Sequence, residues 1–192
     1  YYGLGYCPAR EYRYDDDKTF TSDSLTIPYF RPVFTPHPEG GDDVTWRVVG
    51  LQHRLLRADA PGGKYRPHLA GAGKSLFYTD VMMRRAVGDV LLVEGEIKAM
   101  VTWAALWADE ECLAPGLTVI GTAGAAVKGE LLSELAHVEK IYICLDPDAE
   151  KEAEKLAVML GKERARVIKL PDKIDDLITA GVLDAFTILD LL

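Results

Sequence analysis

Acidic residues follow two short apolar runs in the second half of the chain. Glu94 comes directly after the run of residues 90–93, and Asp146 and Asp148 come after the run of residues 141–145. Short apolar runs of this kind are typical of buried β-strands. The sequence therefore places carboxylates at the ends of two predicted strands, where an α/β sheet commonly binds its ligands.

Predicted strands and helices alternate through this half of the chain. A third apolar run, residues 117–120, separates the two acidic segments, and helical periodicity follows in residues 97–106, 125–138 and 151–160. This alternation predicts an α/β fold with a parallel sheet that is flanked by helices on both faces. Because parallel strands all end at one edge, we expect the three carboxylates to share one crevice there.

Three carboxylates in one crevice repel one another unless a cation lies between them. Their oxygens suit a hard ion such as Mg²⁺, which also binds substrate phosphates. Taken alone, Asp148 is explained as a helix cap and Glu94 as a first-turn acid that the helix dipole favours. Taken together with Asp146, they predict a metal-dependent site for phosphate chemistry.

A further acidic group follows the fourth predicted strand, residues 164–170. Asp172, Asp175 and Asp176 come next in the chain and, by position, face the same edge of the sheet. Asp175 or Asp176 is therefore a candidate ligand of a second metal ion. A capped helix over residues 175–180 explains the same acids equally well.

The order of these segments resembles the Toprim domain of topoisomerases, primases and related nucleases. In that family a strand runs into Glu-Gly, a second strand into a glycine turn and a third into Asp-x-Asp, and this chain supplies VEGEIKA, VIGTAGAA and YICLDPDAE. A later segment, VIKLPDKIDDLI, looks like the stretch that follows the core in bacterial-type DNA primases. The resemblance covers roughly residues 89–181, and its combined signal is fairly specific.

The resemblance implies a primase catalytic core that joins nucleoside triphosphates into short RNA primers on a single-stranded DNA template. In such a core Glu94, Asp146 and Asp148 bind Mg²⁺ or Mn²⁺, or Glu94 acts as general base on the attacking 3′-hydroxyl. Members of the family also work with an upstream zinc-binding module and a replicative helicase. Lys98 departs from the family pattern, because many members carry Asp there. Its ammonium could contact nucleotide or replace a metal charge.

The first half of the chain is much less acidic than the second. Residues 1–89 contain 12 basic and 11 acidic side chains, whereas residues 90–192 contain 10 and 19. A basic segment beside an acidic metal site suits an enzyme that handles phosphodiesters. We therefore predict a smaller, basic, mixed α/β subdomain over residues 1–88 and a Toprim domain over residues 89–192.

Three segments of the first half also resemble the primase core, namely SLTIPYF, WRVVGLQHRLL and GGKYRPH. They suggest Arg54, Lys64 and Arg66 as contacts to nucleic acid or nucleotide. Lys74, in GAGKS, is a candidate phosphate contact, although the first glycine and the preceding strand of a P-loop are missing. The four histidines show no metal-ligand spacing, and the proline-rich stretch 31–43 is expected to be an exposed connection.

The composition fits a globular chain of one or two domains, with 192 residues of which 48% are hydrophobic. No apolar run approaches the roughly 20 residues that span a bilayer, so we expect no contact with a membrane. Three widely spaced cysteines fit neither a disulfide framework nor a zinc site, so we expect a reducing, cytoplasmic location. Because the chain begins at Tyr1, we expect it to be a piece of a longer protein.

Three other functions fit parts of the sequence. A Toprim nuclease would use the same acids for metal-dependent phosphodiester hydrolysis, but it needs no basic template-binding subdomain. A catalytically silent nucleic-acid-binding module of a mobile element fits Lys98 but not the retained acids. A receiver domain shares the parallel layout, but it needs an acidic pair after its first strand, where Glu94 is followed by Gly95. The primase core is therefore the preferred hypothesis.

Overall fold

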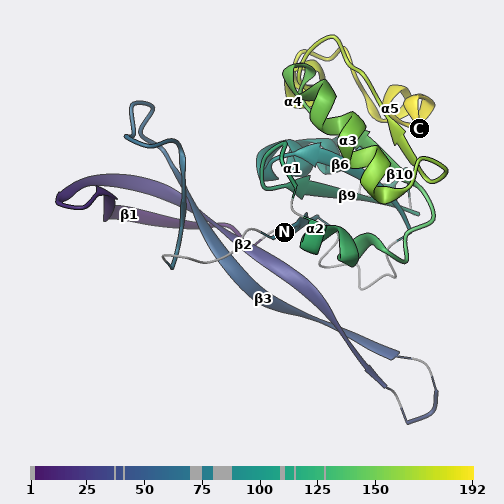
Figure 1. Ribbon diagram of the computed structural model, residues 1–192, viewed down its shortest axis with the longest axis horizontal. Coiled ribbons are helices and arrows are strands. Elements are labelled where there is room, and N and C mark those ends of the chain that lie inside the picture. The colour runs from purple at the N-terminus through teal and green to yellow at the C-terminus, as the bar shows by residue number, and fades with distance from the viewer. Residues whose placement is uncertain are drawn as a thin grey trace. The chain divides into compact units, whose positions relative to one another are not determined.

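The fold is given by a computed structural model that describes residues 3–36, 38–40, 42–69, 75–79, 88–108, 111–114, 116–127 and 129–192. The chain divides into two compact units, residues 1–74 and 75–192. In the described residues, strands form the first unit and a sheet with helices forms the second (Figure 1). The chain therefore has the mixed α/β architecture that the sequence predicts.

The division between the units falls earlier than the expected boundary between residues 88 and 89. A short strand, β5 (Phe77–Tyr78), pairs antiparallel with β9 (Leu117–Thr122) of the second sheet. This pairing attaches β5 to the second unit. The first subdomain also differs from the expected α/β mixture, because every regular element among its described residues is a strand.

The first unit is an antiparallel sheet whose strands, in spatial order, are β1 (Gly5–Asp15), β2 (Lys18–Pro36), β3 (Asp42–Leu55) and β4 (Tyr65–Pro67). β1 pairs with β2 only as far as Thr26, and β4 pairs only with residues 52–54 of β3. Beyond these contacts β2 and β3 pair with each other alone. They form the long two-stranded ribbon seen in Figure 1.

The stretch 31–43, expected to be an exposed connection, is largely exposed where it is described, but residues 31–36 and 42–43 belong to the strands of this ribbon and only 38–40 form a turn. β2 continues through Pro28, Pro32 and Pro36, all of which are paired with residues of β3. Proline lacks the N–H that a ladder needs, so a sheet tolerates it where a strand has a neighbour on one side only. In this region β2 has only β3 beside it, because its pairing with β1 ends at Thr26.

A hydrogen-bond network joins the strands of the first unit. Oη of Tyr12 lies 2.7 Å from Oγ of Ser24, which lies 3.0 Å from Nδ1 of His53. Nε2 of His53 lies 2.7 Å from Nη1 of Arg10 and 2.9 Å from Nδ1 of His68. Arg10 Nη1 lies 3.0 Å from the same nitrogen of His68. Because a guanidinium only donates, both imidazole nitrogens that face it are acceptors.

The surroundings of His53 keep it neutral. Its side chain is 1% exposed. Burial, the positive charge of Arg10 and the neighbouring His68 lower the pKa of His53 from 6.5 to about 4. The pairing of β3 with β4 brings His53 and His68 together, which their separation in the sequence did not indicate.

Acidification should weaken the first unit through His53. Between pH 6.5 and about 4 an unfolded His53 binds a proton and the folded one does not, so stability falls as the pH falls, by at most about 3 kcal/mol. Hydrogen-exchange mass spectrometry of β3 at about pH 7 and about pH 4.5 measures the loss of protection. His53→Gln should show a smaller dependence on pH, whereas His137→Gln, in the second unit, should behave as the parent chain. Equal protection of β3 in the parent chain at both pH values would contradict this role.

The second unit contains a five-stranded sheet whose strands, in spatial order, are β11 (Ala165–Val167), β10 (Ile141–Cys144), β6 (Asp89–Glu94), β9 and β5. β6 is parallel to β9 and β10, and β10 is parallel to β11. The four central residues of β6 and all residues of β9 are buried. This burial is typical of parallel strands that are covered on both faces.

The helices of the second unit are α1 (Glu96–Ala105), α2 (Gly129–Leu132), α3 (Glu150–Leu160), α4 (Ile174–Thr179) and α5 (Ala185–Leu191). Shorter elements are the strands β7 (Trp107–Ala108) and β8 (Glu111–Cys112) and the 3₁₀ turns η1 (Ser133–Leu135) and η2 (Pro147–Ala149). The expected helices over residues 97–106, 151–160 and 175–180 match α1, α3 and α4. The expected helix over residues 125–138 is wrong in length, because of the residues described there only α2 and η1 are helical.

The order of the parallel strands reverses beside β6. The chain passes from β6 through α1 to β9 on one side, and then through α2 to β10 on the other side. Such a reversal leaves a crevice at the carboxyl ends of the two strands that flank it. Glu94 ends β6 and Asp146 follows β10, so both residues lie at this point of the sheet.

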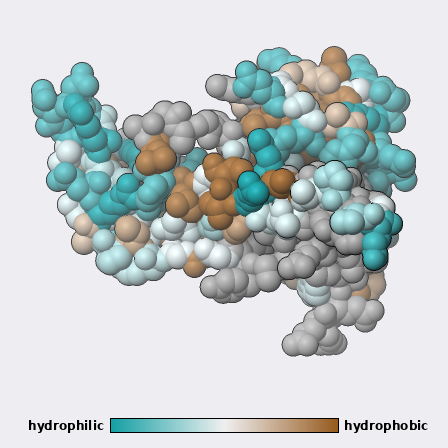
Figure 2. Space-filling view, turned by 90° about the horizontal axis from the view of Figure 1, so that it is seen from below, coloured by the Kyte–Doolittle hydropathy of each residue, from teal (hydrophilic) through white to brown (hydrophobic). Residues whose placement is uncertain are grey.

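In Figure 2, hydrophilic and hydrophobic residues are both visible on the coloured surface, and hydrophobic residues occur in several areas. Exposed large hydrophobic residues occur in both units, among them Val48, Leu69, Val158 and Phe186. Partial exposure of apolar side chains is usual in folded proteins. No helix in the described part of the chain is long and apolar enough to span a lipid bilayer.

Candidate functional site

Two glycines hold Glu94 at the edge of the sheet. Gly95 has φ 89° and ψ 162°, a conformation that glycine adopts without strain, and α1 begins directly after it. Its N–H donates to the carbonyl of Thr122 at 2.9 Å. A Cβ on Gly121 would lie only 2.7 Å from the carbonyl oxygen of Gly95. The turn after Glu94 is therefore packed directly on the backbone of β9.

Lys98 and Asp146 form a partly buried ion pair across the crevice. Nζ of Lys98 lies 3.1 Å from Oδ2 of Asp146, and the two side chains are 16% and 11% exposed. Lys98 lies on α1, whereas Asp146 follows β10. The pair therefore joins a helix that follows one strand to the end of the neighbouring strand.

The acids of the crevice act on one another. Burial raises the pKa of Glu94, and the negative charges of Asp146 and Asp148 raise it as well. Lys98 and the backbone N–H of Asp146, which donates to the Glu94 carboxylate, oppose this increase. The structure thus brings Glu94, Asp146, Asp148 and Lys98 together at one edge, and their chemical roles stay predictions.

The later acids lie on a neighbouring helix. Asp175 and Asp176 are in the first turn of α4, which packs against α1. Oδ1 of Asp175 is buried and has no hydrogen-bond partner in the described part of the chain. Asp148 is exposed and lies in η2. The proposed second metal site at Asp175 or Asp176 stays a prediction.

The carboxylates of the crevice suit a metal ion that is bound by substrate phosphates as well as by the protein. Among the described residues, no three His, Cys, Asp or Glu side chains are placed to hold a metal ion together. Mg²⁺, however, is usually held by one or two carboxylates together with waters and substrate phosphates. The raised pKa of Glu94 reflects burial and an excess of negative charge at the edge, which a hard cation would relieve. The carboxylates therefore fit Mg²⁺ or Mn²⁺ in that mode of binding.

The predicted contacts to nucleic acid lie in the first unit. Arg54 is half-buried, and its Nε has no hydrogen-bond partner within the described residues. Lys64 is exposed. Arg66 donates to the backbone carbonyls of Pro61, Gly62, Gly63 and Tyr65 and so holds its own loop. Lys74 lies outside the described residues. The binding roles of these four residues stay predictions.

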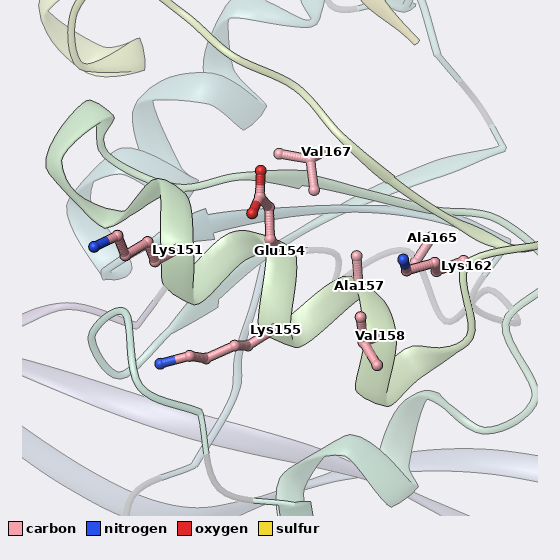
Figure 3. A pocket seen from close by; sticks show the side chains of 8 residues that line it. All are labelled: Lys151, Glu154, Lys155, Ala157, Val158, Lys162, Ala165 and Val167. Atoms are coloured by element: carbon pink, nitrogen blue, oxygen red, sulfur yellow. The ribbon is translucent and has the colours of Figure 1, made fainter.

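A groove of about 800 Å³ opens beside α3, and its lining includes Ala165 and Val167 of β11. In Figure 3 the carboxylate of Glu154 points towards Val167, whereas Lys151 and Lys155 extend away from it. None of the acids of the crevice lines this groove. The candidate site is therefore the open end of the sheet and not this hollow.

The sequence analysis did not identify Glu96 as a buried acid beside the candidate site. Glu96 opens α1 and is only 3% exposed, which is unusual for a carboxylate. Its place two residues after Glu94, within the segment EGE, was the available signal. The sequence pattern did not distinguish it from an ordinary first-turn acid.

No protein-family model matches the chain, and no curated protein matches it. Among solved structures, the crystal structure of the primase fragment of the bacteriophage T7 primase-helicase protein aligns with a TM-score of 0.57. The alignment covers 89% of this chain and 62% of that fragment at 16% identity. The chain shares the fold of this primase fragment.

A second primase structure gives the same result. It contains bacteriophage T7 lagging-strand DNA polymerase interacting with primase domains bound to an RNA/DNA hybrid and dTTP. The TM-score is 0.56 at 16% identity, over 88% of this chain and 76% of the other. At this identity the likeness establishes the fold alone.

Gly121→Ala should destabilise the second unit by about 1–3 kcal/mol, because the new Cβ overpacks against the Gly95 carbonyl. Urea unfolding followed by circular dichroism measures the change. Gly129→Ala is the matched control, since its Cβ would meet nothing closer than a methionine methyl at 3.9 Å. An unchanged unfolding midpoint for Gly121→Ala would show that the backbone moves apart without cost.

Glu94→Gln should raise the melting temperature in EDTA at about pH 8. The raised pKa means that the folded chain binds the proton more tightly than the unfolded chain, so Glu94 costs stability as the pH rises above its ordinary range. Glutamine removes this cost and still accepts from the Asp146 N–H. The exposed Glu139 precedes β10, and Glu139→Gln should leave the melting temperature unchanged. A lower melting temperature for Glu94→Gln would contradict the assigned electrostatics.

Proposed function

We propose that the chain is the catalytic core of a metal-dependent DNA primase. Its substrates would be nucleoside triphosphates and a single-stranded DNA template, and its product a short RNA primer. The observation that supports this most is the placement of Glu94, Asp146 and Asp148 at the strand-order reversal of a sheet with a phage-type primase fold. We further propose that the second unit is a Toprim domain, on the segments VEGEIKA, VIGTAGAA and YICLDPDAE.

The side chains of the edge have distinct parts in this proposal. Asp146 and Asp148 would hold Mg²⁺ or Mn²⁺, which when bound neutralises charge on the nucleotide phosphates. Glu94 would accept the proton of the attacking 3′-hydroxyl or complete the metal site. The raised pKa of Glu94 makes it a stronger proton acceptor than an ordinary glutamate. Lys98, already beside Asp146, would contribute a fixed positive charge to the same place.

The first unit would bind the template. Arg54, Lys64, Arg66 and Lys74 are the proposed contacts, of which Lys64 is exposed. One of the T7 structures contains an RNA/DNA hybrid and dTTP on its primase domains, which supports nucleic acid and nucleotide as partners here. A replicative helicase is a further proposed partner. The chain spans 62% of the T7 primase fragment, so activities that need the rest of such a protein are also proposals.

A second candidate is a catalytically silent module that binds nucleic acid. The specific observation in its favour is the ion pair of Lys98 with Asp146, because an ammonium already neutralises one acid of the edge. Such a module would bind single-stranded DNA without forming or cleaving phosphodiester bonds. The assay below separates these possibilities and also reveals a Toprim nuclease, which would shorten the DNA.

Asp146→Asn should reduce primer synthesis by roughly 100-fold or more, because it removes a carboxylate that would hold the metal ion, whose charge would stabilise the transferred phosphoryl group. The assay combines the chain with single-stranded DNA, labelled nucleoside triphosphates and Mg²⁺ or Mn²⁺, and products are separated by size. Glu139→Gln removes a charge before the amino-terminal end of β10, opposite the end that Asp146 follows, and should retain the activity. Template binding without synthesis in the parent chain would favour the silent module.

A further inference from the structure

Lys98 is held in place more firmly than a surface lysine. Its Nζ lies 3.1 Å from Asp146, and both side chains are mostly shielded from water. It is four residues beyond the end of β6 on α1, and the Gly95 turn fixes the start of that helix. The ammonium therefore has a defined position at the edge where the carboxylates meet.

The charge of Lys98 acts on Glu94 as well as on Asp146. A divalent cation at the same edge would be repelled by this ammonium and would compete with it for the Asp146 carboxylate. The described residues also offer no ready-made cage of three ligands.

We propose that Lys98 is a resident counter-ion that prevents the free edge from holding a divalent metal ion until nucleotide phosphates supply further ligands. Metal and nucleotide would then bind together, and the free chain would hold metal only weakly. The expectation that metal and nucleotide increase each other's affinity rests on the proposed function. The expectation that metal alone binds weakly rests on Lys98 and Asp146.

The test measures Mn²⁺ binding to the full chain by electron paramagnetic resonance and calorimetry, without nucleotide. Lys98→Met keeps the length and apolar stem of the side chain but removes the charge. It should bind Mn²⁺ at least about tenfold more tightly than the parent chain, because a fixed positive charge a few ångströms away is lost. Lys98→Arg keeps the charge and should bind as weakly as the parent.

Two controls separate this effect from a general change. Lys155→Met removes an equal charge from an exposed position on α3 and should leave Mn²⁺ binding unchanged. Lys98→Gln, with circular dichroism of every variant, provides a second neutral side chain if Lys98→Met is poorly folded. Equal or weaker Mn²⁺ binding by the folded neutral variants, including none at all, would overturn the proposal.

A second titration, with a nucleoside triphosphate present, tests the mutual enhancement. Nucleotide should increase the Mn²⁺ affinity of the parent chain more than that of Lys98→Met, after correction for metal bound by free nucleotide. Both readouts are independent of primer synthesis. A chain that binds metal as expected but makes no primers would refute the proposed primase function and leave the role of Lys98 intact.

Discussion

Negative charge at the carboxyl end of a buried strand is the constraint on which the second unit depends. β6 is paired on both edges and buried along its centre, and it ends in Glu94. The parallel register with β10 sets Asp146 beside it. Lys98 reaches the same place because Gly95 allows the chain to pass from strand to helix within one residue. A single glycine turn therefore positions both the acid of β6 and the ammonium that offsets it.

In the first unit a cation, Arg10, likewise lies against two hydrogen-bond acceptors, which here are the uncharged ring nitrogens of His53 and His68. Arg10 places one guanidinium nitrogen against acceptor nitrogens of His53 and His68. Two lone pairs that face each other at 2.9 Å would repel without a donor between or beside them. In both units a side-chain cation thus occupies the point at which lone pairs converge.

The alternation of apolar runs and helical periodicity was enough to predict the parallel strands and the helices α1 and α3 of the second unit, because parallel strands must be buried on both faces, but it did not predict the antiparallel β5 or the shortness of α2. The convergence of Glu94 with Asp146 followed from the same reasoning, since it depends on strand direction alone. The ion pair of Lys98 could not be predicted, because it depends on how α1 leaves the sheet. The first unit was predicted poorly. Prolines are ordinarily signals of a loop, and only the absence of a second neighbour beside β2 allows a strand to contain three of them. The pairing of His53 with His68 likewise depends on strand contacts that their spacing does not reveal.

The length of β2 and β3 has a mechanical consequence. Where these strands extend past β1 and β4, β2 and β3 are hydrogen-bonded only to each other among the described residues. The register shift between Tyr29 and Phe30 interrupts the regular pairing along the ribbon. In the described part of the chain, the ribbon is anchored only at one end, where β1 and β4 pair with β2 and β3. β2 and β3 are therefore fixed at the end near the network around His53, whereas near Pro36 they pair, among the described residues, only with each other.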